Sequence, residues 1–323
     1  MAVPSNTVQT FSRNSIREDL TNIISNIDPT ETPFISNIGS GKAKQRLHEW
    51  QVDNLVAANG DNKTIEGDDA TIDSSPATSR RNNYTQLMDK AVSVSSTSRA
   101  VDNAGYADEL AYQAAKRGKE LKRDKEVRAC GNYAAVPGGA GTAGEMAGAV
   151  AFITTNASRG VGGADGTLSG TTSGYVDAAA TNGTLRNFTE DQLKDAIQQA
   201  WTAGGSPSMA LMSGTLKQTA STFTGIAAQR KHQSGGGQAT IIGAADVYVS
   251  DFGDISFVPS RFTTGRDVLI IDPSLWKMCD LQGYSMVDLA KTGHSDKKLM
   301  SWEGTLQCQN EAGNAVVADV QAA

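Results

Sequence analysis

The chain of 323 residues lacks long apolar runs and is short of positive charge, and each shortage excludes a class of protein. Its longest uncharged stretch, residues 196–216, is interrupted by Gln, Gly and Pro, whereas a membrane span needs about 20 mostly apolar residues. The 29 Lys and Arg are outnumbered by 35 Asp and Glu, which disfavours a dedicated nucleic-acid binder. We therefore expect no membrane-spanning segment and no sequence-specific recognition of nucleic acid.

Cysteine is also scarce. Cys130, Cys279 and Cys308 are far apart in the sequence and have no metal-ligand spacing, so we predict free thiols in a reducing compartment. The first ten residues carry neither the basic nor the apolar region of a secretory signal, and secretion is not expected.

Two helical patterns are present in the first half of the chain. Ser15 and Glu18 form a capping box ahead of an apolar stripe, which predicts a helix that ends at Asp28-Pro29. A longer helix is predicted over residues 102–130. Its second half is dense in charge, which we interpret as a solvated face with ion pairs between successive turns; the alternative is a surface that faces phosphate.

Between these helices, two β patterns flank a polar segment. Residues 44–55 and 88–94 alternate with a period near two, and residues 57–83 between them are polar and rich in Gly and Asp. A connection of this length inside a compact domain is unusual, so we predict an extended two-stranded ribbon that projects from the body. Because an isolated ribbon is marginal in water, it needs another surface to lie on.

The second half of the chain changes from loop to helix to strand. Residues 132–186 have few charges and much Gly, Ala, Thr and Ser, which indicates loop apart from a short element over 146–153. Thr189 and Gln192 cap a predicted helix that ends at Gly204-Gly205. The predicted elements that follow are a strand over 209–212, a helix over 216–223, a short helix after Asp272-Pro273, and strands over 247–250, 255–258, 268–271, 285–290, 299–308 and 315–320.

The last two of these strands flank the turn residues 311–314 and are predicted to form a hairpin. Trp302, Leu306 and Cys308 share one face of the first strand, which predicts that this face is buried. Helical and β patterns together indicate an α+β protein.

The motifs of catalysis are almost entirely missing. Gly139, Gly141 and Gly144 fit the G-x-G-x-x-G spacing of a dinucleotide site, with Asp165 about twenty residues further on. The residues before them make a poor strand, and in such a glycine-rich segment the match is expected by chance. We predict no catalytic residue, cofactor or metal, and retain a nucleotide-binding enzyme that uses this glycine loop as an alternative.

Segments along most of the chain resemble tailed-phage major capsid proteins of the SU-ten-like group. The resemblance is carried, in order, by residues 14–20, 28–39, 48–51, 118–124, 197–205, 246–253 and 289–293. It implies the Hong Kong 97 type coat fold, with an N-terminal arm, an extended β-ribbon loop, a peripheral domain with a long spine helix and β-sheet, and an axial domain.

The resemblance also implies a place for each part of the chain. The arm would be 1–41, the extended loop 42–95, the peripheral domain 96–131 with 284–323, and the axial domain 187–283, while the placement of 132–186 stays open. Contacts between subunits are predicted on the arm and ribbon, at Trp50, Asp68, Asp69, Arg80, Arg81, Phe34 and Ile35.

The implied function is that of a major capsid protein, which assembles from hexamers and pentamers into an icosahedral shell around the genome. Implied partners are further copies of the chain, portal, scaffolding and decoration proteins, and packaged double-stranded DNA, with assembly in the bacterial host cytoplasm. No residue pair stands out for covalent cross-linking. A surface-array protein remains as a further alternative.

Overall fold

The computed structural model describes residues 30–53, 55–70, 72–73, 77–101, 105–170, 173–223 and 246–322. The helix and capping box predicted from Ser15 onward lie outside the described residues.

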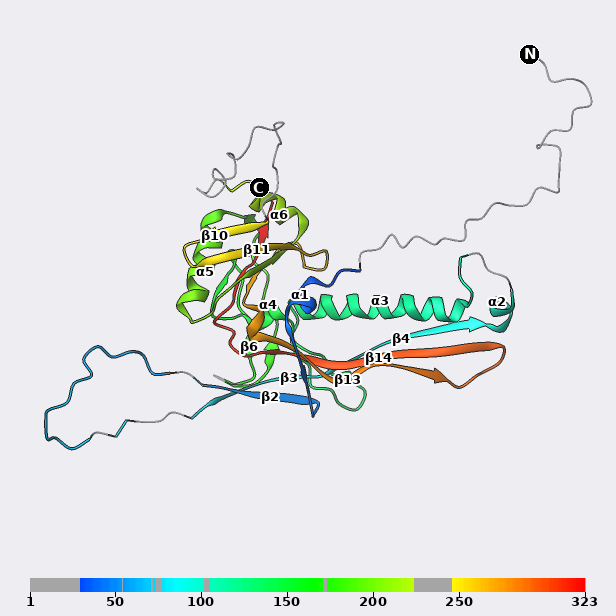
Figure 1. Ribbon diagram of the computed structural model, residues 1–323, viewed down its shortest axis with the longest axis horizontal. Coiled ribbons are helices and arrows are strands. Elements are labelled where there is room, and N and C mark those ends of the chain that lie inside the picture. The colour runs from blue at the N-terminus through cyan, green and yellow to red at the C-terminus, as the bar shows by residue number, and fades with distance from the viewer. Residues whose placement is uncertain are drawn as a thin grey trace, which may run out of the picture.

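A four-stranded sheet with one long helix beside it forms the extended part of the body (Figure 1). The helix α3 (Glu109–Cys130) packs against the sheet through Leu121, which is fully buried. In the sheet, the strand β1 runs parallel to its neighbour and the other neighbouring pairs are antiparallel. The order of the strands is β1 (Gly39–Lys42), β13 (Trp276–Leu289), β14 (Ser295–Cys308) and β4 (Gln86–Ser95).

The long helix starts seven residues later than the predicted residue 102. Asp108 accepts a hydrogen bond from the N–H of Leu110, so it is the N-cap and the helix begins after it. The preceding residues form a separate short helix, α2 (Ser96–Ala100), which has its own cap at Ser95.

A six-stranded sheet forms the second part of the body. Its order is β10 (Val247–Ser250), β11 (Gly253–Pro259), β9 (Met209–Met212), β12 (Val268–Ile271), β15 (Ala315–Val317) and β5 (Ala157–Ser158). All residues of β9, β12 and β15 are buried, because the core with α5 (Glu190–Thr202) and α6 (Gly214–Ala220) covers one face of these strands and a second core, which includes residues 149–152, covers the other. The predicted capping box of α5 is confirmed: Thr189 and Gln192 bond to each other's backbone N–H.

The projecting ribbon is present, but its returning strand differs from the prediction. The strand β2 (Leu47–Val52) pairs antiparallel with β3 (Ser79–Tyr84), so that Leu47 faces Tyr84 and Val52 faces Ser79. The predicted partner, residues 88–94, lies instead in β4, which pairs with β14. Met88 and Val94 are buried there, so the period-two pattern of this segment comes from burial in the four-stranded sheet.

The predicted C-terminal hairpin is wrong. β14 and β15 flank residues 311–314 but belong to different sheets, and β15 pairs with β12. The turn therefore connects the two sheets. Asn314 holds the crossing in place, since its Oδ1 accepts from the N–H of Asp272 and from Nε1 of Trp276, both at 2.9 Å.

Residues 132–186 are more ordered than their composition suggests. The helix α4 (Ala149–Phe152) is wholly buried, in the same apolar cluster as Trp276 and Trp302. The remaining short elements are α1 (Pro33–Asn37), β6 (Thr167–Leu168), β7 (Val176–Ala178), β8 (Arg186–Asn187), the 3-10 helix η3 (Pro273–Leu275) and β16 (Val320–Gln321). In the described part of the chain, no helix combines the length and the apolar character that crossing a bilayer requires.

Candidate functional site

The glycine motif lies in a tight turn and opens no helix. Gly139 and Thr142 exchange backbone hydrogen bonds of 3.0 and 3.2 Å, and Val136 and Glu145 exchange two more outside them. The next helix begins only at Ala149. A dinucleotide site needs its glycines at the junction of a strand and a helix N-terminus, so this geometry contradicts the nucleotide-binding interpretation. Among the described residues, no group of three or more His, Cys, Asp or Glu is placed to hold a metal ion.

The ribbon tip comprises residues 53–78, and its described residues, 53, 55–70, 72–73 and 77–78, extend away from the body (Figure 1). Every residue described from 55 to 70 is exposed, including Asp68 and Asp69, two of the predicted contact residues. The N–H of Asp68 donates to the carbonyl of Ile65 at 3.1 Å, which forms a local turn. Both carboxylates therefore stand where a second molecule can reach them.

Four large apolar side chains on the tip are also exposed, and the sequence analysis, which described the tip as polar, missed them. Leu55 and Ile72 are 99% and 94% exposed, and Val56 and Ile65 are almost as open. Four large apolar side chains exposed within one short segment provide apolar surface that a second molecule could bury. Their irregular spacing among polar residues gave no periodic signal.

The ribbon root, where β2 and β3 leave the body, holds three further predicted contact residues. Arg80 is exposed and lies 3.9 Å from Glu49 across the ribbon. Trp50 is almost buried and packs on Phe152, with ring centroids 6.3 Å apart. Trp50 and Arg81 line a surface cavity beside the end of β14. Trp50 thus anchors the ribbon within its own chain, and its contact with another subunit stays a prediction.

The two predicted contact residues of the arm also face their own chain. Phe34 is fully buried with its ring edge-on to Trp276, at a centroid distance of 5.9 Å, and Ile35 is partly buried. The backbone N–H groups of both donate to the carboxylate of Glu126 on α3, at 2.7 and 2.9 Å. Phe34 is therefore a core residue of its own chain, because α1 docks on the long helix, and the subunit contacts of the arm stay a prediction.

The predicted solvated face of α3 is present, with Lys116, Lys119, Lys122 and Asp124 exposed, but Lys125 and Glu126 are buried exceptions. Burial raises the pKa of the Glu126 carboxyl, although the two N–H donors oppose this shift. On the preceding residue, the Lys125 ammonium lies 4.1 Å from the Trp302 ring centroid and 3.6 Å from Asp280. Burial lowers the pKa of Lys125, and Asp280 partly offsets this. Both residues hold the helix to other elements of the body.

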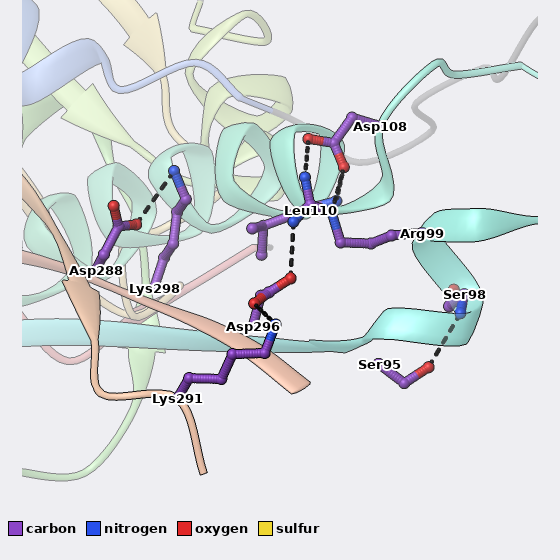
Figure 2. Close-up of polar contacts among 9 residues, drawn as sticks. All are labelled: Ser95, Ser98, Arg99, Asp108, Leu110, Asp288, Lys291, Asp296 and Lys298. Carbon is purple, nitrogen blue, oxygen red and sulfur yellow. Dashed lines mark hydrogen bonds and ion pairs between the residues drawn. The ribbon is translucent and has the colours of Figure 1, made fainter. Parts of the chain in front are cut away.

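A cluster of charged residues lies at the N-terminal end of α3, where α2 meets the turn between β13 and β14 (Figure 2). Arg99 is its centre: its guanidinium donates to Asp296 at 2.7 Å and to both oxygens of Asp108, at 3.1 and 3.3 Å. Lys291 also pairs with Asp296, at 2.9 Å. We call Arg99, Asp108, Asp288, Lys291, Asp296 and Lys298 the charged corner.

Ion pairing shifts the titration of this corner. Hydrogen bonds from Lys291 and then Arg99 lower the pKa of Asp296, and the bond from Arg99 lowers that of Asp108. Asp108 also caps α3, so the same carboxylate joins the helix start to α2. Sequence analysis did not find this cluster, because its members come from three separate stretches of the chain.

The comparisons with known proteins agree with the resemblance. The profile of the family described as "SU10 major capsid protein" matches residues 3–321. The major capsid protein of Escherichia phage Phieco32 is 37% identical over 116 residues, which are 36% of this chain. The match spans 33% of that relative's length.

Solved structures show the same fold at low sequence identity. A chain of the native GTA particle capsid superposes with a TM-score of 0.60 at 12% identity, over 99% of this chain and 100% of that chain. A chain of Mycobacterium phage Bobi gives 0.58 at 12% identity, over 95% and 96%. A structure of phage G major capsid and decoration proteins gives 0.54 at 9% identity, over 98% and 99%. The chain therefore belongs to the SU10 major capsid protein family and has the α+β fold of the Hong Kong 97 type phage capsid proteins.

Proposed function

We propose that this chain is the coat subunit of a tailed phage, and that its copies assemble as hexamers and pentamers into an icosahedral shell around double-stranded DNA. The observation that carries the proposal is the ribbon tip, which extends from a well-packed body and has four large apolar side chains in solvent. The family match over residues 3–321 supports it.

The tip needs a second molecule for a physical reason. Ordering one backbone residue costs about 1–2 kcal/mol, and residues 55–70 bury no side chain in their own subunit to offset it. Burying an exposed Leu, Ile or Val stabilises by about 1.5–3 kcal/mol per side chain. Another copy of the chain offers such a surface many times over in a shell. We propose that Leu55, Val56, Ile65 and Ile72, with Asp68 and Asp69, contact a neighbouring subunit.

The same proposal assigns the parts of the chain to places in a shell. The arm 1–41 and loop 42–95 link subunits, and 96–131 with 284–308 form the peripheral domain. The six-stranded sheet, built mainly from 187–283, forms the axial domain around capsomer centres. Because β15 pairs with β12, we place residues 315–317 with the axial domain. The buried α4 suggests that 132–186 is a linking layer between them.

The net charge of −6 supports a shell that encloses the packaged DNA without binding it tightly. A negatively charged wall repels DNA, so the genome can be filled and released without adhesion or sequence-specific contacts. Portal and scaffolding proteins are expected partners. The phage G structure contains decoration proteins, which supports a decoration protein as a further partner of this shell. We place assembly in the bacterial host cytoplasm and propose no enzymatic activity.

The test is to shorten the tip while keeping the root. Residues 55–77 are replaced by a short Gly/Ser turn, and the purified protein is examined by circular dichroism, urea unfolding and electron microscopy. We expect an unchanged spectrum and unfolding midpoint, with no stable shells. Shells of normal stability would contradict the proposal, and an unfolded protein would show that the tip belongs to its own subunit.

Two full-length variants separate the kinds of contact. Leu55, Val56, Ile65 and Ile72 are all changed to Ser in the first, and Asp68 and Asp69 are changed to Ser in the second. We expect the first variant to lose shells almost as completely as the shortened tip. The second variant should assemble, with shells that dissociate at a lower temperature.

A further inference from the structure

Asn83 occupies an unusual position at the ribbon root. It lies on β3, one residue before the strand ends, and is fully buried although it is polar. Its Nδ2 donates to the carbonyl of Leu306 on β14 at 2.8 Å, and its Oδ1 accepts from the N–H of Ala147 at 3.0 Å. One side chain therefore joins the ribbon to two separate segments of the body.

The two backbone groups that Asn83 binds depend on it. β4 pairs with β14 only as far as Gly304, so the carbonyl of Leu306 lies beyond the last pair on that edge. Ala147 lies in irregular chain just before α4, where Met146 is held in the same way by Gln86. A buried carbonyl and a buried N–H both need partners, and the side-chain amide of Asn83 supplies a donor for the one and an acceptor for the other.

Trp50 also holds the root by packing on Phe152, but its Nε1 makes no hydrogen bond to any described residue, and the other hydrogen bonds at the root come from the backbone or from less buried side chains. Gly174 exchanges backbone bonds with Arg80 and Asn82, at 2.9 and 3.3 Å. His48 lies 3.3 Å from Gln307 on β14. Asn83 is the one of these residues whose hydrogen-bonding side chain is fully buried, so it is the point about which the ribbon would pivot.

Because the tip lies far from the root, a small rotation of the ribbon at the root displaces the tip by a large distance. Six residues of β2 span about 20 Å at 3.3 Å per residue, and the tip continues beyond them. A swing of about 10° at the root would move the far end of β2 by ~3 Å, as much as the whole length of a hydrogen bond. Neighbouring subunits would then not meet the tip in register.

We propose that Asn83 is a positioning residue for assembly: its two buried hydrogen bonds fix the direction in which the ribbon leaves the body. This inference rests on the proposed function, because the direction matters only where the tip contacts another subunit. It goes beyond that function in naming the residue that sets the geometry of the contact.

The experiment measures ribbon direction and shell formation separately. Spin labels are placed at Gln51→Cys on β2 and Lys116→Cys on α3, both exposed positions, and the distance distribution is measured in unassembled subunits. The unlabelled chains are examined for shells by electron microscopy. The variants are Asn83→Ala, Asn83→Asp and, as the matched control, Asn82→Ala, which removes a bond to Glu49 inside the ribbon and none to the body.

We expect a narrow distance distribution for the unaltered chain and for N82A, and a broad one for N83A, with the yield of closed shells reduced about tenfold or more. N83D keeps the acceptor for Ala147 but has no donor for Leu306 while it is ionised. Its distribution should be broad at neutral pH and narrow at mildly acidic pH, where the protonated carboxyl donates again. If N83A is insoluble, the pH dependence of the distance distribution of N83D tests the inference in its place.

A narrow distribution for N83A, or for N83D at neutral pH, would overturn the inference. So would N83A shells that match those of the unaltered chain in yield and size. If the unaltered chain forms no shells while the labels behave as expected, Asn83 is the anchor of the ribbon and the proposed function is what fails.

Discussion

The six-stranded sheet and the ribbon tip differ in whether their own chain buries their apolar side chains. Every residue of β9 and β12 is buried, between helices that the same chain provides. In the tip, every residue described from 55 to 70 is exposed, and the large apolar side chains have no cover from their own chain. The sheet is thus complete within one subunit, whereas the tip is, in our proposal, completed by another.

This difference separates two kinds of substitution. A change in the body removes packing that folding itself requires, so folding and assembly should be lost together. A change in the tip leaves the subunit folded, since it removes nothing that the subunit buries. The arm and the charged corner lie between these limits, because a few buried or ionic contacts hold each of them to the body.

The largest effect is expected in the body. Trp302 is fully buried, its Nε1 donates to Asp280 at 2.8 Å, and Lys125 lies over its ring. Trp302→Ala should cost about 3–5 kcal/mol of unfolding free energy, measured by urea unfolding, and should abolish shells. Trp201→Ala is the control, because Trp201 is 52% exposed and its loss should change stability little. Equal unfolding midpoints for the two variants would remove Trp302 from the core.

An intermediate effect is expected where the arm docks. Glu126→Gln keeps one acceptor oxygen but brings an NH₂ group against the second N–H donor, which should cost about 1–3 kcal/mol. Limited proteolysis and amide exchange at residues 33–37 measure the release of α1. Glu120→Gln, on the same helix but away from the arm, is the control. Unchanged exchange at Phe34 and Ile35 would show that Glu126 does not hold the arm.

The pH dependence of this contact has a defined sign. The pKa of Glu126 is raised in the folded chain, so the folded state binds the proton more tightly than the unfolded state. Its contribution to stability therefore decreases as pH rises through the window between the ordinary and the raised pKa. Unfolding midpoints of the unaltered chain and of Glu126→Gln, compared across that window, isolate the contribution.

A smaller effect of opposite sign is expected at the charged corner. The pKa values of Asp108 and Asp296 are lowered, so their stabilising contribution is complete above the ordinary carboxyl pKa and is lost as pH falls through the lowered values. Acid, high salt or Arg99→Gln should each speed amide exchange in residues 96–101. The unaltered chain near neutral pH is the reference, and exchange that does not respond to salt would contradict an ionic origin.

The smallest effect is expected from the cysteines. Cys130, Cys279 and Cys308 are all buried and free, and burial raises the pKa of the Cys308 thiol. Purified protein should migrate identically on reducing and non-reducing gels. A ladder of disulfide-linked species would show that at least one of the three thiols becomes accessible at the surface of the protein.

Local patterns predicted local structure well. The capping box of α5 and the strands at 209–212, 247–250 and 268–271 appear where the sequence placed them, because each depends on neighbouring residues. The buried face of β14 is likewise confirmed, since Trp302, Leu306 and Cys308 are all buried.

Choices between distant partners could not be predicted in this way. The pattern at 88–94 fits either partner, and its burial beside β14 rather than in the ribbon depends on residues more than 200 positions away. The same holds for β15, whose partner strand depends on the crossing between the sheets at Asn314. The sequence also could not show that Lys125 and Glu126 are buried, because their neighbours Trp302 and Phe34 are distant in the chain. The exposed apolar residues of the tip were missed because they follow no period.

Amide hydrogen exchange of the tip, compared between assembled shells and dissociated subunits, tests the central claim most directly. If another copy completes the tip, peptides covering residues 55–70 should exchange rapidly in the subunits and be strongly protected in the shells. Peptides from β9 and β12 should be protected equally in both states. Rapid exchange of the tip in intact shells would contradict the account, because the tip would then have no partner in the assembly that it is proposed to build.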